Sequence, residues 1–291
     1  MNRQITPTEL ALFSRSPVIG AWWEQLNKID PNRAPKPKAD VLDQLLFESG
    51  HKHEQLLIKD LKNNGKKVKQ LSGKMNGESF EETLNAVHDG KYDFIHQASL
   101  QNNELRGSAD LLERIDMPSK LGNWSYIPIE CKLSSHPKPI YLVQACAYCE
   151  LLEPILGYLP ENFKLYLGGR KFEKGPDGYR LDDFWMWYKN LRDRYQKFIE
   201  DFDESQQPEY SPGDHGHWSS FVEEKLENKR DLILVAGMRQ SQRKKLIYSG
   251  ISTIDELAKA SRSQIINQMD EKIFFRLKEQ AAIQIHPAQS D

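Results

Sequence analysis

Three charged side chains between residues 107 and 132 are spaced for metal-assisted hydrolysis. Asp110 ends the run Gly107-Ser108-Ala109-Asp110, and Glu130-Cys131-Lys132 follows an apolar stretch. Residues two apart on a strand point to the same side, so Glu130 and Lys132 are predicted to share one wall of a cleft. Two carboxylates bind a hard divalent cation through oxygen. A lysine beside them can position and deprotonate a water for attack on phosphorus.

Each acid taken alone has a second interpretation. Asp110, flanked by Ala and Leu, and Glu130 can equally be exposed acids of an edge strand. The placement of Lys132 two residues after Glu130 favours a shared site over two unrelated surface acids.

The order of these motifs resembles the RecB-like branch of the PD-(D/E)xK nucleases. The matching residues are Gly-x-x-Asp at 107–110, Glu-x-Lys at 130–132, Gln-x-x-x-Tyr at 144–148 and, upstream, Gly50-x-x-His53-Glu54. The chain is most similar to a bacterial subgroup of predicted RecB-like nucleases with a helical tail. This resemblance extends over roughly residues 5 to 285. Each motif is short, so the resemblance depends on their order and spacing.

The resemblance implies a role for each motif residue. Asp110 and Glu130 are the expected ligands of Mg²⁺ or Mn²⁺, and the Cys131 carbonyl can add another. Lys132 is expected to orient the attacking water and offset charge in the transition state. His53 is the expected extra ligand, which favours Mn²⁺ because imidazole is the softer donor. The alternative for His53 is an exposed helical histidine, since only the motif spacing selects it over His51.

Gln144 and Tyr148 are predicted to lie on one helix face, because residues four apart are neighbours on a helix. The resemblance implies that this face borders the site and contacts the catalytic groups or the DNA backbone. The alternative is a helix face packed on the sheet with two satisfied polar ends. Glu54 either supports the site or is solvated.

An iron–sulfur cluster, which many RecB-like nucleases hold, is not expected here. Such a cluster needs about four thiolates, and the chain has three cysteines. Ser16 and the loop Pro212 to Trp218 stand where the related pattern has cysteines. His215 and His217 in that loop are more typical of solvated residues than of a metal site. Cys146 and Cys149 are predicted to pack in the core, since free Cys behaves as a small hydrophobe.

The elements that must position these residues follow from periodicity and turn residues. A long amphipathic helix is predicted over 40–61, and a close approach of another segment would explain Gly50 within it. The predicted core is three strands, a helix and a strand, at Asp93–Ser99, Leu105–Ile115, Ser125–Cys131, Ile140–Leu152 and Phe163–Leu167. The fold class is therefore α/β: a restriction-endonuclease-like core, a mixed sheet flanked by helices, with a small all-α C-terminal module.

The C-terminal part is predicted to be a separate module. The predicted divisions are a nuclease domain at 1–228, a helical module at 229–285 and a tail at 286–291. Residues 229–285 carry a formal charge of +5, whereas the whole chain carries -2. Residues 234–239 resemble a helix-hairpin-helix, with Arg239 where the usual hairpin has its second glycine. The module is either a phosphate-contacting face, with Arg239, Arg243, Lys244 and Lys245 as the DNA-binding residues, or a helical packing module.

The function expected from these features is a metal-dependent DNA nuclease, exonuclease-like on DNA ends or single strands and typical of DNA repair. Alternatives are a catalytically inactive nucleic-acid-binding or assembly module of a larger helicase-nuclease system, and an RNA or small-molecule hydrolase. DNA is the expected partner, with RNA not excluded and a helicase region or partner protein as a further one. With no secretory signal, no apolar run long enough for a membrane and few cysteines, a cytoplasmic location is expected.

Overall fold

The computed structural model describes residues 3–39, 41–169, 171–261, 263 and 269–285. These divide into two compact units, the first from residues 1–17 and 38–203 and the second from 18–37 and 204–291. The second unit therefore takes in residues 18–37 and 204–228 besides the predicted module of 229–285. The predicted tail, 286–291, lies outside the described residues. No helix in the described ranges combines the length and apolar character needed to cross a bilayer.

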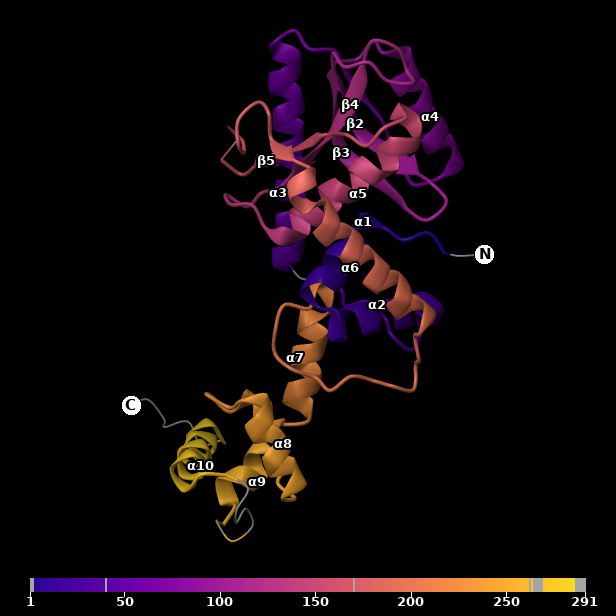
Figure 1. Ribbon diagram of the computed structural model, residues 1–291. Helices are drawn as coiled ribbons and strands as arrows, with labels where there is room; N and C mark the ends of the chain where they lie inside the picture. Colours follow the sequence, from indigo (N-terminus) through magenta and orange to yellow (C-terminus); the bar gives the residue numbers. More distant parts are fainter. Residues whose placement is uncertain (1–2, 40, 170, 262, 264–268, 286–291) are drawn as a thin grey trace. The chain divides into compact units, whose positions relative to one another are not determined.

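The first unit contains the elements that the sequence predicts around the acids. The helices are α1 (Pro7–Arg15), α3 (Val41–Asn63), α4 (Gly77–Asp89), α5 (Pro139–Leu156) and α6 (Asp182–Glu200). The strands are β1 (Val68–Gln70), β2 (Phe94–Gln101), β3 (Arg106–Ile115), β4 (Ser125–Cys131), β5 (Asn162–Leu167), β6 (Lys171–Phe172) and β7 (Tyr179–Arg180). The predicted strand–strand–strand–helix–strand order over residues 93–167 is confirmed (Figure 1).

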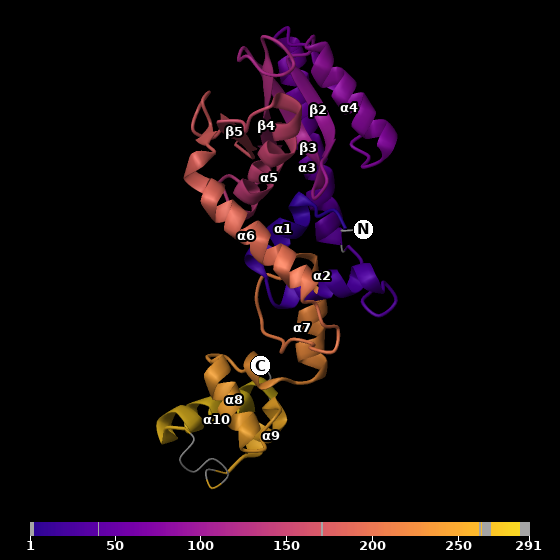
Figure 2. The same ribbon diagram turned by 45° about the vertical axis from the view of Figure 1, so that its right-hand side comes forward.

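These strands form one mixed sheet in the order β1-β2-β3-β4-β5-β6, and β7 also pairs with β5. β2, β3 and β4 are an antiparallel meander, whereas β1 runs parallel to β2 and β5 parallel to β4 (Figure 2). The parallel β4–β5 pair requires a crossover, which α5 supplies. Helices flank the sheet, so the α/β class with a mixed, helix-flanked sheet is confirmed (Figure 1).

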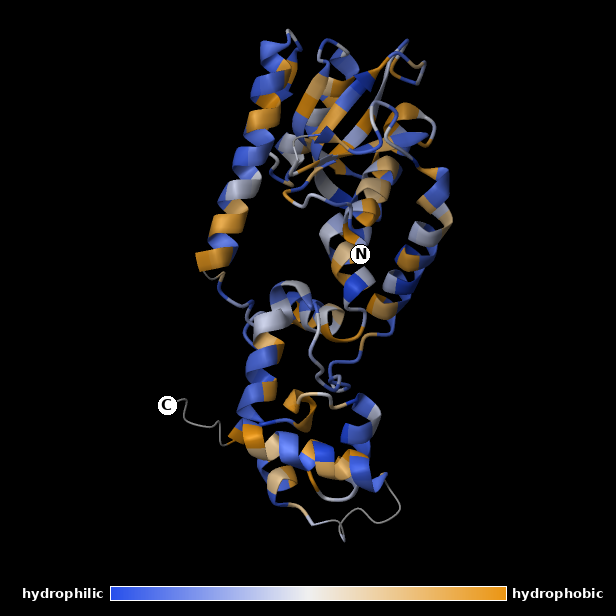
Figure 3. Cartoon of the chain, turned by 90° about the vertical axis from the view of Figure 1, so that its left-hand side faces the viewer, coloured by the Kyte–Doolittle hydropathy of each residue, from blue (hydrophilic) through white to orange (hydrophobic). Residues whose placement is uncertain are grey.

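α3 is mostly exposed, and its buried residues are His53, Leu57 and Ile58. Leu57 and Ile58 are buried near its end, and Leu57 packs with Leu111 and Ile129 of the sheet. The first turns, at the left of Figure 3, are strongly hydrophobic yet exposed, with Phe47 at 80% exposure. The predicted close approach of another segment to Gly50 is not present. The nearest atom to an added Cβ is Leu133 Cδ1 at 4.0 Å, which is an ordinary contact.

The second unit is helical. Its helices are α2 (Ile19–Ile29), α7 (Ser219–Asn228), α8 (Gln240–Tyr248), α9 (Ile254–Lys259) and α10 (Glu271–Ile285), with short 3₁₀ turns at Gly216–Trp218 and Leu232–Leu234. Leu232, Leu246, Leu257, Phe274 and Leu277 are fully or almost fully buried in one cluster. Residues 232–281 therefore have a hydrophobic core of their own, as expected for a helical module.

Gly107 in the Gly-x-x-Asp motif has a packing reason. α1 begins at Pro7, after a Thr6 cap whose side chain and Glu9 bond each other's backbone N–H groups. This start places the Pro7 ring against β3. A Cβ added at Gly107 would lie 2.8 Å from Pro7 Cδ and 3.1 Å from Tyr148 Cε1. β3 can therefore approach α1 and α5 only without a side chain here.

Gly107→Ala is expected to lower the free energy of unfolding by about 1 to 3 kcal/mol, the usual cost of overpacking. Urea unfolding monitored by circular dichroism measures this. The control is Gly77→Ala at the first turn of α4, where an added Cβ meets nothing within 4 Å. Equal stability of the two variants would contradict the packing reason.

Candidate active site

Asp110 and Glu130 lie on neighbouring antiparallel strands, and the Lys132 ammonium contacts both carboxylates. Lys132 Nζ forms an ion pair with Glu130 Oε1 and lies 3.4 Å from Asp110 Oδ2. The Cys131 backbone N–H donates to Asp110 Oδ2 at 2.8 Å, which fixes that carboxylate against β4. The predicted grouping of Asp110, Glu130 and Lys132 on one wall is therefore present.

Burial gives this cluster unusual electrostatics. Glu130 is 1% exposed. Burial first, and then the nearby Asp110 charge, raise the pKa of Glu130 to about 8. Burial also raises the pKa of Asp110, although Lys132 acts against it. For Lys132, burial alone would lower the pKa, but the charges of Glu130 and Asp110 outweigh burial and raise it. One ammonium thus faces two acids that are costly to ionise.

Glu54 of α3 is a third acid near this cluster. Its Oε2 accepts hydrogen bonds from His96 Nε2 at 3.2 Å and from Gln97 Nε2 at 3.0 Å. Burial alone would raise the pKa of Glu54, but these hydrogen bonds outweigh it and lower the pKa. The Lys132 charge also lowers the pKa of Glu54, so Glu54 interacts electrostatically with the cluster. The open alternative of a solvated Glu54 is excluded.

The Gln97 backbone is strained where it faces Asp110. The β2–β3 ladder pairs His96 with Leu111 and Ala98 with Ala109, so Gln97 and Asp110 occupy the place between. Gln97 has φ 56°, a region that residues other than glycine seldom adopt. Such strain persists where surrounding contacts fix it, and it gathers at functional sites. Here the contact is the Gln97 amide on Glu54.

The two histidines of α3 have different surroundings. His53 is buried and its ring stacks on Tyr166, with centroids 4.9 Å apart. Its Nε2 is buried and has no hydrogen-bond partner within the described part of the chain. His51 is exposed and, like Glu54, lines the pocket beside Lys132. The alternative of an exposed His53 is wrong, whereas its predicted role as a metal ligand stays a prediction.

Tyr148 is held at the site by α5, which begins at Pro139 and ends at Gly157, a left-handed cap with φ 83°. The Tyr148 hydroxyl donates to the Ser108 carbonyl at 2.7 Å. Burial, and then the Glu130 and Asp110 charges, raise the pKa of Tyr148. Tyr148 therefore braces β3 next to Asp110. Gln144, one turn earlier, is half-buried.

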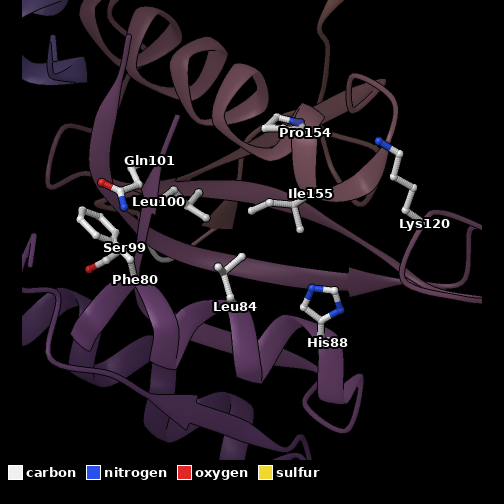
Figure 4. Close-up of a pocket in the computed structure, with 9 residues that line it drawn as sticks. All are labelled: Phe80, Leu84, His88, Ser99, Leu100, Gln101, Lys120, Pro154 and Ile155. Atoms are coloured by element: carbon white, nitrogen blue, oxygen red, sulfur yellow. The ribbon is translucent and has the colours of Figure 1, made fainter. Parts of the chain in front are cut away.

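Lys132 of this cluster lines a pocket of about 590 Å³, whereas Asp110 and Glu130 are not among its lining residues. Its lining comes from α3, β2, the end of β4 and the segment after β1, and includes Phe47, Glu54, Ser72, Gln97 and Lys132. A second pocket, of about 420 Å³, lies between α4, β2 and the end of α5, where Leu84 and Ile155 face each other (Figure 4). No carboxylate lines this second pocket, whereas Glu54 and Lys132 line the first.

Asp110 and Glu130 offer a free oxygen to a divalent cation, but no third protein ligand joins them in the described part of the chain. Glu130 Oε2 is buried with no hydrogen-bond partner among the described residues, so it has a lone pair to offer. Within the same residues, no three His, Cys, Asp or Glu side chains form a group that could hold a metal ion. Mg²⁺ commonly takes one or two carboxylates and completes its shell with water and substrate phosphate. Asp110 and Glu130 suit that kind of site.

The cysteines and the two histidines of the loop at 212–218 make structural contacts. Cys131, Cys146 and Cys149 are free and buried, as the packing prediction requires for Cys146 and Cys149. His215 and His217 are not simply solvated, contrary to expectation. His215 Nε2 bonds the Ser211 carbonyl at 2.8 Å, and His217 Nε2 bonds Glu24 Oε2 at 2.9 Å. The predicted absence of an iron–sulfur cluster stays a prediction.

The residues predicted to bind DNA in the C-terminal module have unequal surroundings. Arg243 is buried, and its Nε and Nη2 donate to the two Asp231 oxygens at 2.6 and 2.7 Å. This ion pair accounts for Arg243 within the module. Arg239, Lys244 and Lys245 are exposed. Their predicted contact with phosphate stays a prediction, and so does that of Arg243.

Comparison with protein-family models gives no match for the chain, and comparison with curated proteins gives none either. The function must therefore be argued from the geometry of the site.

The raised pKa of Glu130 predicts how stability changes with pH in EDTA. The folded protein holds this proton more tightly than the unfolded chain, in which a glutamate has its ordinary pKa of 4.5. The free energy of unfolding therefore falls as pH rises from about 4.5 to about 8 and is flat above. Glu130→Gln cannot ionise, so its stability relative to wild type should rise by up to a few kcal/mol across that window.

Urea unfolding at pH values across this window measures the difference. The control is Glu82→Gln on the exposed face of α4, which should show no such trend. A pH-independent difference for Glu130→Gln would mean that Glu130 is not buried as a costly charge.

Proposed function

We propose that this chain is a metal-dependent nuclease that hydrolyses phosphodiester bonds of DNA, with a restriction-endonuclease-like core built by β2, β3, β4, α5 and β5. The observation that carries the proposal is the half-buried Asp110 beside the buried Glu130, with the Lys132 ammonium in contact with both. When both acids are ionised, one ammonium leaves the cluster with net negative charge, and the buried Glu130 Oε2 has no hydrogen-bond partner among the described residues. The motif order in the sequence adds the expectation of DNA as substrate.

Asp110 and Glu130 would hold Mg²⁺ or Mn²⁺, which when bound polarises the phosphate and acidifies water. Lys132 stays an ammonium, because the two carboxylates raise its pKa. It therefore orients water and offsets negative charge on phosphorus as a hydrogen-bond donor, and the base role considered from the sequence is disfavoured. Glu54 is placed beside the cluster by His96 and Gln97, which hold its carboxylate ionised. Tyr148 positions the strand that carries Asp110.

The pocket suits a phosphodiester rather than a small apolar substrate. Its lining alternates polar groups (His51, Glu54, Ser72, Gln97 and Lys132) with Phe47 and Leu71. It is open to solvent at Phe47, which is 80% exposed. A nucleic-acid strand that passes through such a pocket can present one phosphate to Lys132 while the nucleotides on either side extend into solvent.

Lys132→Ala should lower cleavage by at least about 100-fold while leaving the fold and cation binding in place, because it removes water positioning but no carboxylate. The assay incubates labelled single- and double-stranded DNA and RNA with Mg²⁺, Mn²⁺ or EDTA and resolves the products. Lys138→Ala is the matched control, since Lys138 is exposed at the start of α5.

Two outcomes would contradict the proposal. Wild-type protein that binds nucleic acid but cleaves none of the substrates with either cation would favour the inactive binding module. Cleavage by Lys132→Ala at the wild-type rate would place the chemistry elsewhere.

A further inference from the structure

Five lysines that form no salt bridge with the described residues lie in the segment that leads into the candidate site. Residues 61–77 contain five lysines and no Asp or Glu, a formal charge of +5 in a chain whose total is -2. We call Lys62, Lys66, Lys67, Lys69 and Lys74 the lysine strip. This charge equals that of the whole C-terminal module, but it is concentrated in 17 residues.

No carboxylate of the described residues neutralises the lysine strip. None of its members forms a salt bridge there; Lys62 Nζ donates to the Gln70 amide oxygen at 2.8 Å, and Lys69 Nζ lies 5.9 Å from the Tyr92 ring centroid. Asp93, the nearby acid on the sheet, accepts the Lys67 backbone N–H at 2.7 Å. The ammonium groups are therefore left for a partner outside the chain.

The lysine strip surrounds the terminal strand of the sheet, with Lys69 in β1 and the other members in the segments before and after it. β1 is the terminal strand of the order β1-β2-β3-β4-β5-β6, so one of its two edges is unpaired among the described residues. The flanking backbone is fixed as well, because the Lys74 carbonyl accepts the Ser99 hydroxyl at 2.9 Å. Lysines in and beside an edge strand offer positive charge to a polyanion, and a lysine in such a strand also opposes edge-to-edge pairing.

The lysine strip leads directly into the candidate site. Gln70 pairs with His96, and the Leu71 N–H donates to the His96 carbonyl at 3.1 Å. Gly73 follows, so close to Gln97 that an added Cβ would lie 2.5 Å from Gln97 Oε1. His96 and Gln97 are the two residues that hold Glu54. Gln70, Leu71 and Ser72 also line the pocket that contains Lys132.

We infer that the lysine strip binds the phosphate backbone of the nucleic-acid strand whose scissile bond enters the Lys132 pocket. This inference rests on the proposed function, because it names the path of that substrate. It differs from the expectation that the basic C-terminal module supplies the phosphate contacts. Backbone contacts by lysine are independent of base sequence, so the strip should set affinity and salt dependence without setting sequence preference.

The test compares two fourfold variants of the full chain in EDTA, where cleavage cannot interfere. The strip variant carries Lys66→Gln, Lys67→Gln, Lys69→Gln and Lys74→Gln. The module variant carries Lys244→Gln, Lys245→Gln, Lys259→Gln and Lys272→Gln, all exposed lysines of the second unit. Fluorescence anisotropy with labelled oligothymidylate gives Kd at several salt concentrations, and thermal unfolding checks that both variants fold.

In the strip variant, the slope of log Kd against log salt concentration should be smaller than in the wild type by about 1.4 to 2.8. This corresponds to two to four lost phosphate contacts on a single strand, at about 0.7 each. A change smaller than one contact, in a folded strip variant, would overturn the inference whatever the module variant does. Failure of the wild type to bind any nucleic acid would instead overturn the proposed function.

A parallel measurement separates nucleic acid from another polyanion. Vesicles of phosphatidylserine and phosphatidylcholine are titrated with wild type and the strip variant. Binding to vesicles that depends on the lysine strip, without an effect on oligothymidylate, would assign the strip to a membrane surface and contradict the inference.

Discussion

The structure depends on two carboxylates that the fold forces together away from water. Asp110 and Glu130 come from adjacent antiparallel strands, and burial raises the pKa of each. The Asp110 charge raises the pKa of Glu130 further, and the Glu54 charge does the same for Asp110. One ammonium, Lys132, compensates part of that charge. Burying acids without full compensation is costly, so such a pair persists when a proton or a cation completes it. The requirement for a further positive charge is the physical basis of the proposed function.

The surrounding elements can be understood as the means of holding this pair. The Cys131 N–H fixes Asp110, and the Tyr148 hydroxyl fixes the Ser108 carbonyl two residues before it. Gln97 adopts a strained backbone opposite Asp110, and its side chain holds Glu54. Substrate steering is then a separate task. The lysine strip in and around β1 supplies positive charge outside the pocket, where no member of it forms a salt bridge with the acids.

The sequence predicted the core well because its signals are local. The strands predicted from local residue patterns correspond to β2 to β5. The helix predicted at Ile140–Leu152 corresponds to α5, which extends four residues further, to Leu156. The spacing of Glu130 and Lys132 predicted their common side. The role of Glu54 could not be predicted, because it depends on His96 and Gln97, which are more than forty residues away.

Other features were missed for different reasons. The lysine strip is visible in the composition of residues 61–77. It was missed because net charge was counted only over the whole chain and over residues 229–285. Its position next to the pocket follows only from the pairing of β1 with β2. The ion pair of Arg243 with Asp231 also required the fold, since a basic residue in a charged module is otherwise indistinguishable from a phosphate contact.

The central claim is that Asp110 and Glu130 are a cation site that Lys132 only partly neutralises. Titration of Mn²⁺ followed by electron paramagnetic resonance tests it directly, on wild type, Lys132→Ala and the double variant Asp110→Asn, Glu130→Gln. The account predicts that the double variant loses Mn²⁺ binding, because both charged oxygen donors are gone. It predicts that Lys132→Ala binds Mn²⁺ at least as tightly as wild type, because a competing positive charge has been removed. Wild-type Mn²⁺ affinity in the double variant would contradict the account.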